Sequence, residues 1–170
     1  MAVSLHRYSP RQEPGDLSEA DLLDLWGLLK AEDLVRVFFH DGAVADVREF
    51  MAFATSPAQW FYAAKREGEW IGIGVVNGFS GTGAAAFGHL ASFACGRDGS
   101  FREAGMLWHA LLRGAGVETL LGVIPACYTG ALRWAKSFGY VERMRLKNAL
   151  RIVGRRGGRV VDAVVTQIIL

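Results

Sequence analysis

The sequence predicts one α/β domain built on a single mixed, mostly antiparallel sheet of about seven strands flanked by about four helices. The chain has 170 residues, the usual size of one domain and enough to bury a core without disulfides. Hydrophobic residues make up 51% and charged residues 21%, which excludes a mainly disordered chain. Segments with strand and helix periodicity alternate throughout, with no linker or repeat, so residues 1–170 are expected to form a single domain.

The first part of the chain is expected to form a strand and two helices. Apolar and polar residues alternate over residues 3–8, as in a short strand. Ser18, followed three residues later by Asp21, is typical of a capping box at a helix N-terminus. Pro57 ends the second helix. Apolar residues at helical spacing define both helices: Leu22, Leu25, Trp26 and Leu29 in the first, and Val44, Val47, Phe50, Met51 and Ala54 in the second.

A three-stranded antiparallel meander is predicted next. Its strands are residues 59–66, 70–77 and 85–95, and tight turns containing glycine join them. Gly72 and Gly74 are two residues apart and share one face of the second strand. Because glycine weakens a strand, we expect another part of the chain to approach the backbone closely there.

The second half of the chain is expected to alternate helices and strands. A polar loop at residues 96–100 opens onto a helix carrying Ala104, Leu107, Trp108, Leu111 and Leu112. Residues 117–124 form a mostly apolar strand, and a helix through Ala131, Leu132, Ala135 and Phe138 ends at Gly139. Residues 141–153 and 160–170 form a final hairpin, with its turn at residues 155–158. Trp60, Trp108 and Trp134 are interpreted as core residues.

Charge is distributed unevenly, although the net charge is only +2. Residues 13–49 hold ten acids and three bases, whereas residues 143–159 hold seven bases and no acid. The two segments are either solvated faces or an acidic lobe that attracts a cation and a basic lobe that attracts phosphate. The basic segment contains no aromatic residue on which bases could stack, so a nucleic-acid partner is not expected.

Other features exclude several classes of protein. No apolar run approaches the roughly 20 residues that span a membrane, and no signal peptide is visible. Cys95 and Cys127 are too few for a disulfide framework, and no Cys/His spacing resembles a zinc site, so no metal is expected. We therefore expect a cytoplasmic protein without a membrane partner.

The most informative segment is the strand, loop and helix around residues 96–101. Backbone N–H groups at a helix N-terminus lack intrahelical partners and favour anions, and Gly96 and Gly99 allow a tight turn that presents them. Arg97 and Arg102 add positive charge. The segment lacks the Lys-Ser/Thr of a nucleotide-hydrolysing loop. It is therefore either a structural turn or a phosphate-binding loop.

The order of elements resembles the GNAT superfamily of N-acetyltransferases over nearly the whole chain. Residues 89–95 resemble its fourth strand, residues 96–101 its pyrophosphate loop, residues 117–124 its fifth strand, and residues 131–140 its late helix with a Gly-Phe-like ending. The resemblance implies that acyl-CoA is a co-substrate. Its pantetheine would pair with the backbone of Phe93, Ala94 and Cys95, and its pyrophosphate would bind Gly96, Arg97, Asp98, Gly99, Ser100 and Phe101.

Two positions depart from the GNAT pattern near the expected reaction centre. The tyrosine that serves many members as general acid aligns with Ala135, and the common asparagine after the fifth strand aligns with Tyr128. His89 is the candidate general base, because histidine titrates near neutral pH, and Tyr128 is the candidate acid. Each also has an ordinary interpretation as a packed side chain. Cys127 has no base beside it in sequence, so an acyl-cysteine is not expected.

The sequence therefore predicts an acyl-CoA-dependent N-acyltransferase that uses acetyl-CoA and a direct ternary complex. The acceptor is expected to be the primary amine of a small molecule or peptide, preferably cationic because the acidic segment would border its groove. The alternative is a GNAT-like module that binds CoA or a protein without catalysis. The sequence leaves the oligomeric state open, including a homodimer.

Overall fold

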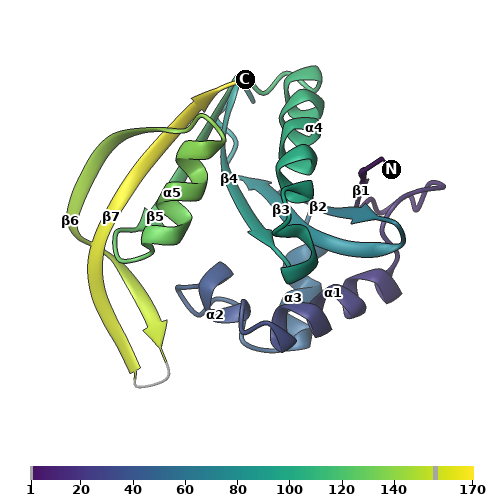
Figure 1. Cartoon of the computed structure of the whole chain (residues 1–170), viewed down its shortest axis with the longest axis horizontal. Helices are drawn as coiled ribbons and strands as arrows, with labels where there is room; N and C mark the ends of the chain where they lie inside the picture. Colours follow the sequence, from purple (N-terminus) through teal and green to yellow (C-terminus); the bar gives the residue numbers. More distant parts are fainter. Residues whose placement is uncertain (1, 155–156) are drawn as a thin grey trace.

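The computed structural model describes residues 2–154 and 157–170 and confirms the predicted sheet of seven strands (Figure 1). The spatial order of the strands is β1-β2-β3-β4-β5-β7-β6. In chain order the elements are β1 (Ser4–Arg7), α1 (Glu19–Ala31), α2 (Val35–Phe38), α3 (Val47–Ala54), β2 (Gln59–Arg66), β3 (Glu69–Asn77), β4 (Ala85–Ser92), the 3-10 turn η1 (Ala94–Gly96), α4 (Ser100–Gly114), β5 (Thr119–Pro125), α5 (Thr129–Ser137), β6 (Val141–Gly154) and β7 (Gly157–Ile169).

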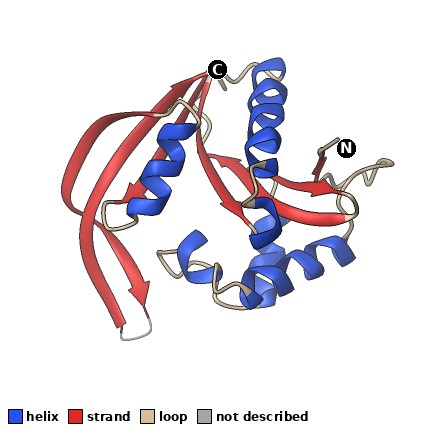
Figure 2. Cartoon of the chain, in the orientation of Figure 1, coloured by secondary structure: helices blue, strands red, loops and turns tan. Residues whose placement is uncertain are grey.

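The sheet opens between β4 and β5. All neighbouring strands are antiparallel except this pair, which is parallel over only three residues, from Ala85 opposite Thr119 to Phe87 opposite Leu121. Beyond these residues β5 continues along β7 while β4 continues along β3. The two strands therefore diverge towards their C-terminal ends, as the ribbon makes clear (Figure 2).

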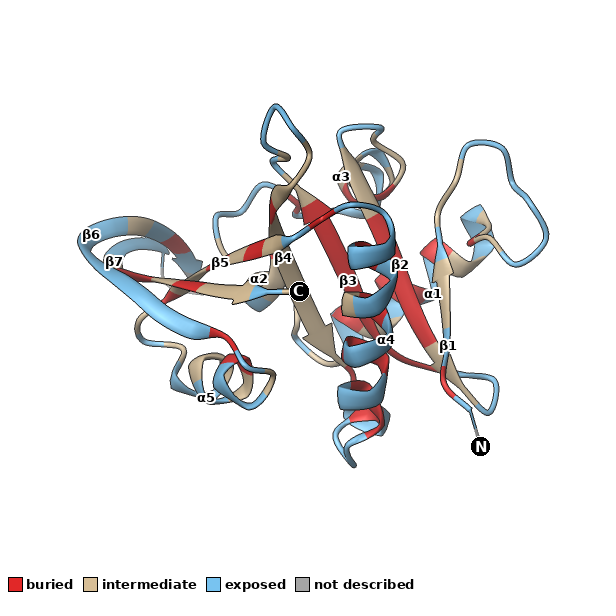
Figure 3. Ribbon diagram, turned by 90° about the horizontal axis from the view of Figure 1, so that it is seen from above, coloured by how far each residue is buried: buried red, intermediate tan, exposed pale blue. Residues whose placement is uncertain are grey.

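Helices cover both faces of the sheet. The predicted capping box is present: the Ser18 hydroxyl accepts the N–H of Asp21, and the Asp21 carboxylate accepts the N–H of Ser18. Helices α1 and α3 pack on one face of β2 and β3, against Phe61 and Ile73, whereas α4 packs on the opposite face. Figure 3 shows that buried residues are concentrated in β2 and β3, between these layers. The core thus lies beside β3, the strand that pairs with β4.

The two glycines of β3 have the close neighbour that the sequence predicted. A Cβ at Gly72 would lie 2.2 Å from Cε2 of Phe101, and one at Gly74 would lie 3.3 Å from Cε2 of Trp108. Both rings project from α4, so that the helix rests directly on the strand. Because these two glycines have no side chain, α4 and the loop before it can lie close to the sheet.

The structure corrects two details of the predicted elements. The third meander strand ends at Ser92, and η1 follows it, instead of extending to Cys95. The four-residue helix α2 was not predicted, because one turn is too short to establish a helical period. Of the expected hairpin turn, residues 155–156 lie outside the described part of the chain. Among the described helices, none is long and apolar enough to cross a membrane.

Candidate active site

A pocket of about 860 Å³ occupies the opening between β4 and β5. On one face of the sheet its walls come from α4 and α5, and on the other from α2 and the residues that follow it. Thr166 of β7 donates a hydrogen bond to the carbonyl oxygen of Gly122 at 3.3 Å, within the antiparallel pairing that keeps β5 with β7 and away from β4. The pocket therefore reaches both faces through the gap in the sheet.

Successive residues of β4 line opposite halves of this pocket. A Cβ at Gly88 would contact Trp108 of α4, and Leu90 packs with the same layer, so both face the α4 side. His89 lies between them and faces α2, where its ring meets Phe38 edge-on with centroids 6.4 Å apart. Strand alternation thus places His89 on the far side of the gap from the α4 loop.

The loop before α4 has the geometry of an anion site. Gly99 has a φ of 106°, in the left-handed region open to glycine, and α4 begins at the next residue. Within the described chain the N–H groups of Gly99 and Phe101 have no acceptor.

Asp98 places a carboxylate at this helix end, which the sequence did not predict as a cap. Its Oδ1 accepts the N–H of Ser100 at 3.0 Å, and its Oδ2 lies 2.8 Å from Nη1 of Arg66. The N–H and hydroxyl of Ser100, with the Arg66 guanidinium, lower the pKa of Asp98 to about 2. The start of α4 therefore stabilises a negative charge, and the Asp98 carboxylate already supplies one.

The expected pairing of pantetheine with Phe93, Ala94 and Cys95 does not match the structure. The N–H of Phe93 is bonded to the carbonyl of Ile71 at 3.0 Å, and the N–H of Ala94 to the Glu32 carboxylate at 2.8 Å. None of the three expected residues lines the pocket. Residues 88–92 of β4 line it instead, because the strand diverges from β5 before residue 93. Of the loop residues, Gly96, Arg97, Gly99 and Phe101 line the pocket, and Asp98 and Ser100 do not.

Two aromatic side chains close the α4 side of the pocket. Phe101 and Trp134 stack with centroids 5.5 Å apart and planes 10° from parallel. Trp134 is half-buried and packs against a core cluster as well as lining the pocket, whereas Trp108 is buried as expected. Tyr140, which the sequence did not single out, also lines this half, and burial raises the pKa of its hydroxyl.

Two histidines lie on the α2 side. Burial lowers the pKa of His89, and the charge of His40 lowers it further. His40 follows α2, lines the same pocket, and also has its pKa lowered by burial. The sequence offered no signal for His40, because its relation to His89 depends on how the α2 segment packs against β4. At neutral pH both rings are uncharged and able to accept a proton.

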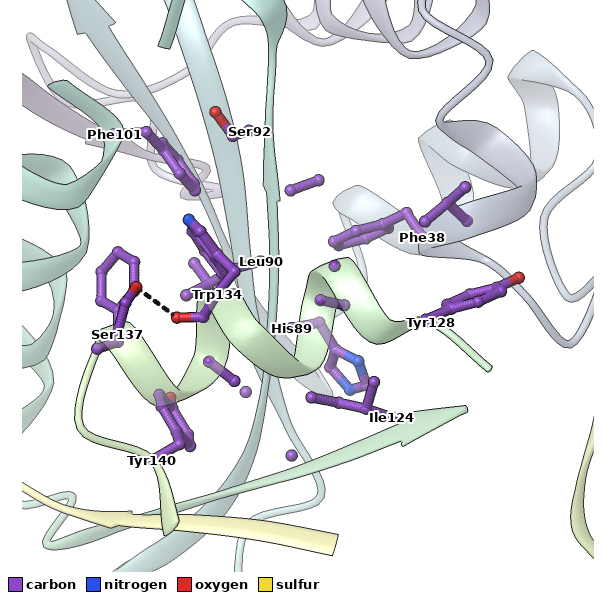
Figure 4. A pocket seen from close by; sticks show the side chains of 18 of the residues that line it. Phe38, His89, Leu90, Ser92, Phe101, Ile124, Tyr128, Trp134, Ser137 and Tyr140 are labelled. Atoms are coloured by element: carbon purple, nitrogen blue, oxygen red, sulfur yellow. Dashed lines mark hydrogen bonds between the residues drawn. The ribbon is translucent and has the colours of Figure 1, made fainter. Parts of the chain in front are cut away.

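Tyr128 lies at the end of β5, where its N–H bonds to the carbonyl of Pro125 at 2.8 Å. It lines the pocket, but Figure 4 shows its hydroxyl directed away from His89 and from Trp134. Burial raises its pKa. This orientation favours a wall residue over a proton donor. Ala135 lines the pocket and supplies no hydroxyl.

The acidic segment borders the pocket as expected, but through Leu34, Val37, Phe38 and His40 and not through its carboxylates. Among the described residues around the cavity there is no Asp or Glu. Glu32 is held by the N–H of Ala94 and by Arg97 at 3.2 Å, on the loop side. Asp33 is paired with Arg36. The fold therefore keeps these carboxylates out of the pocket lining, although the charge of Asp41 acts on both His40 and His89. The preference for a cationic acceptor stays a prediction that the pocket lining does not support.

Acidification is expected to destabilise the fold. Burial lowers the pKa values of His40, His89 and His109, so below the ordinary value of about 6.5 the unfolded chain binds more protons than the folded one. The free energy of unfolding should fall as the pH drops below about 6.5 and level off once the folded histidines are protonated. Urea denaturation at pH 7.5 and 5.5 measures this. Equal free energies at the two pH values would contradict it.

Comparisons with solved structures agree with this architecture. The spermidine N-acetyltransferase of Vibrio cholerae, solved with CoA and spermine, is 13% identical with a TM-score of 0.73, over 98% of this chain and 95% of that one. A ribosomal-protein-alanine N-acetyltransferase of Brucella melitensis is 21% identical (TM-score 0.69, 91% and 97% covered). A GNAT-family acetyltransferase of Streptococcus pneumoniae is 14% identical (TM-score 0.65, 99% and 100% covered). No protein-family model and no curated protein matches the sequence. The architecture and these full-length likenesses together establish that the chain has the GNAT acetyltransferase fold.

Proposed function

We propose that this protein is an acyl-CoA-dependent N-acyltransferase that transfers an acetyl group to a primary amine within a ternary complex. The observation that carries the proposal is the pocket through the gap between β4 and β5. It joins a helix N-terminus suited to phosphate on one face to a neutral histidine on the other. A donor and an acceptor can therefore enter from opposite faces and meet in the gap.

Each half of the pocket has its own task in this proposal. The N–H groups of Gly99 and Phe101, with Arg97 and Arg102, would bind the pyrophosphate of CoA. Residues 88–92 would pair with the pantetheine in place of the missing strand neighbour. Phe101 and Trp134 would exclude water from this half.

The chemistry requires one base. His89 would accept a proton from the acceptor amine as the nitrogen attacks the thioester carbonyl and the C–S bond breaks. The departing thiolate, with a pKa near the value of about 8.5 for a thiol, leaves without an obligatory proton donor. This fits the alanine at position 135 and the orientation of Tyr128. Replacement of Tyr128 by Phe is then expected to change kcat by less than about tenfold.

Substitutions of charge at the loop test the CoA site. Arg102→Glu is expected to weaken CoA binding about 10–100-fold, because it replaces a charge-assisted hydrogen bond with repulsion. Asp98→Asn should strengthen binding severalfold, because it removes the carboxylate from the anion site while keeping an oxygen for the Ser100 N–H. Titration calorimetry with CoA measures both effects. Arg113→Glu, at the far end of α4, is the matched control. Equal affinity in all of these variants would place CoA elsewhere.

A module that binds CoA without catalysis is the second candidate. It is favoured by the lack of a hydroxyl at position 135. An assay of CoA release from acetyl-CoA over a panel of primary amines separates the two candidates. Bound CoA without release on any amine would support the binding module.

A further inference from the structure

The half of the pocket that faces α2 has an apolar wall. Val37 and Phe38 of α2 lie on one side of it, and Ile124 and Tyr128 at the end of β5 on the other. Figure 4 shows Phe38, Tyr128, Ile124 and His89 together, apart from the Phe101 and Trp134 rings of the opposite half. On the proposed function this half receives the acceptor.

Phe38 is held in place as part of this wall. The next residue, Phe39, is buried in the core and meets the Phe38 ring edge-on at 4.9 Å, which anchors α2 to the domain. The Phe38 ring also meets the His89 ring edge-on, with centroids 6.4 Å apart. Val37 also lines the cavity but is 47% exposed. An apolar group on the acceptor would therefore cover the exposed side chain of Val37. It would also lie beside Phe38, whose ring contacts His89, the proposed base.

The charges around this half argue against a polycation. Burying an ammonium group is costly unless a carboxylate compensates it, and no described residue around the pocket is an Asp or Glu. On the α2 side the histidines that line the pocket are His40 and His89, which would repel a cation when protonated, whereas the nearby Asp41, which acts on both rings, does not line the pocket. A single amine that is uncharged on entry avoids this cost. An α-amino group has an ordinary pKa of about 7.7–8.0, against about 10.4 for a lysine-like amine.

We propose that the acceptor is a monoamine carried on an apolar group about the size of an aromatic ring, which packs between α2 and the end of β5 with its nitrogen towards His89. This inference rests on the proposed function and names the acceptor class for it. A small aromatic amine and a peptide N-terminus with an apolar first residue both belong to this acceptor class.

Equilibrium binding tests the acceptor class independently of turnover. L-phenylalaninamide and spermidine are titrated at pH 8 into the protein saturated with CoA. If CoA does not bind, the same two amines are titrated into the free protein. Phenylalaninamide is expected to bind at least about tenfold more tightly. A peptide with an N-terminal Phe, compared with phenylalaninamide, distinguishes the peptide source from the small-molecule source.

Substitutions on the wall make the test specific. Phe38→Ala should weaken phenylalaninamide about tenfold and leave spermidine unchanged. Val37→Glu should reverse the preference, because it supplies the missing carboxylate at a solvent-exposed position. Leu23→Glu is the matched control, an equally exposed aliphatic position on α1 that does not line the pocket, and should keep the original preference.

Several results would overturn the proposal. Spermidine binding as tightly as phenylalaninamide would do so, as would binding of neither probe. Octanoyl-CoA binding more tightly than acetyl-CoA in a manner that requires Phe38 would assign the wall to the acyl chain instead. Turnover is read separately: tight, Phe38-dependent amine binding without CoA release sustains the acceptor class and contradicts the transferase.

Discussion

Replacing His89 by glutamine is expected to lower kcat by about 10²–10⁴-fold, the range typical of a positioned base. The side chain lies in the gap of the sheet, beside Phe38 and on the acceptor half of the pocket. Glutamine keeps a similar size and polarity but cannot take a proton. Steady-state kinetics with acetyl-CoA and an accepted amine measures the effect, while titration with CoA should give an unchanged affinity.

The pH profile distinguishes a base from a packed histidine. Since burial lowers the pKa of His89, kcat of the unsubstituted protein for the proposed reaction should rise with pH through an inflection below about 6.5, and His89→Gln should lose that inflection. His109→Gln is the control, because burial also lowers the pKa of His109 but its side chain does not line the pocket. A full rate for His89→Gln, or an inflection that survives in it, would mean that another group is the base.

The second large effect is expected at Gly105, where α4 and α5 meet. A Cβ there would lie 2.0 Å from Cε1 of Phe138, which lines the pocket, so Gly105→Ala must push the two helices apart or displace the ring. Overpacking of this kind costs about 1–3 kcal/mol. We expect the free energy of unfolding to fall by that amount and CoA affinity to fall with it, because α4 and α5 enclose the cofactor half.

Gly114 of the same helix provides the matched control. Nothing lies within 4 Å of a Cβ at Gly114, so Gly114→Ala should be neutral or should stabilise by up to about 1 kcal/mol, since alanine favours helix over glycine. Urea denaturation of both variants decides between the outcomes. Similar stabilities would show that α5 adjusts to the extra methyl group without strain.

Local rules explain the parts of the fold that the sequence predicted. The capping box at Ser18, the helical spacing of apolar residues in α4, and the alternation in β1 each depend on neighbours a few residues apart. The loop that opens onto α4 was predicted for the same reason, because glycines and a helix start leave a local signal. Even Gly72 and Gly74 indicated a close contact before its partners, Phe101 and Trp108, were known.

Long-range packing decided the site itself. The N–H of Ala94 meets the carboxylate of Glu32, 62 residues away, and this contact accompanies the end of β4 before the residues expected to pair with pantetheine. His40 and His89 share a pocket only because the α2 segment packs beside β4. No period or motif records such pairings, since they depend on the relative placement of whole elements.

The sequence by itself therefore determined the order and type of the elements other than α2 and η1, the single domain and the position of the helix end that opens α4, because these follow from local spacing and backbone preference. Only the tertiary structure decided which charges reach the pocket. It left Asp98 at the α4 end, and it placed apolar residues of the acidic segment in the pocket wall while none of the described residues around the pocket is an Asp or Glu. The physical reason is that electrostatic and apolar contacts act through space, between residues whose distance along the chain carries no information about their distance in the fold.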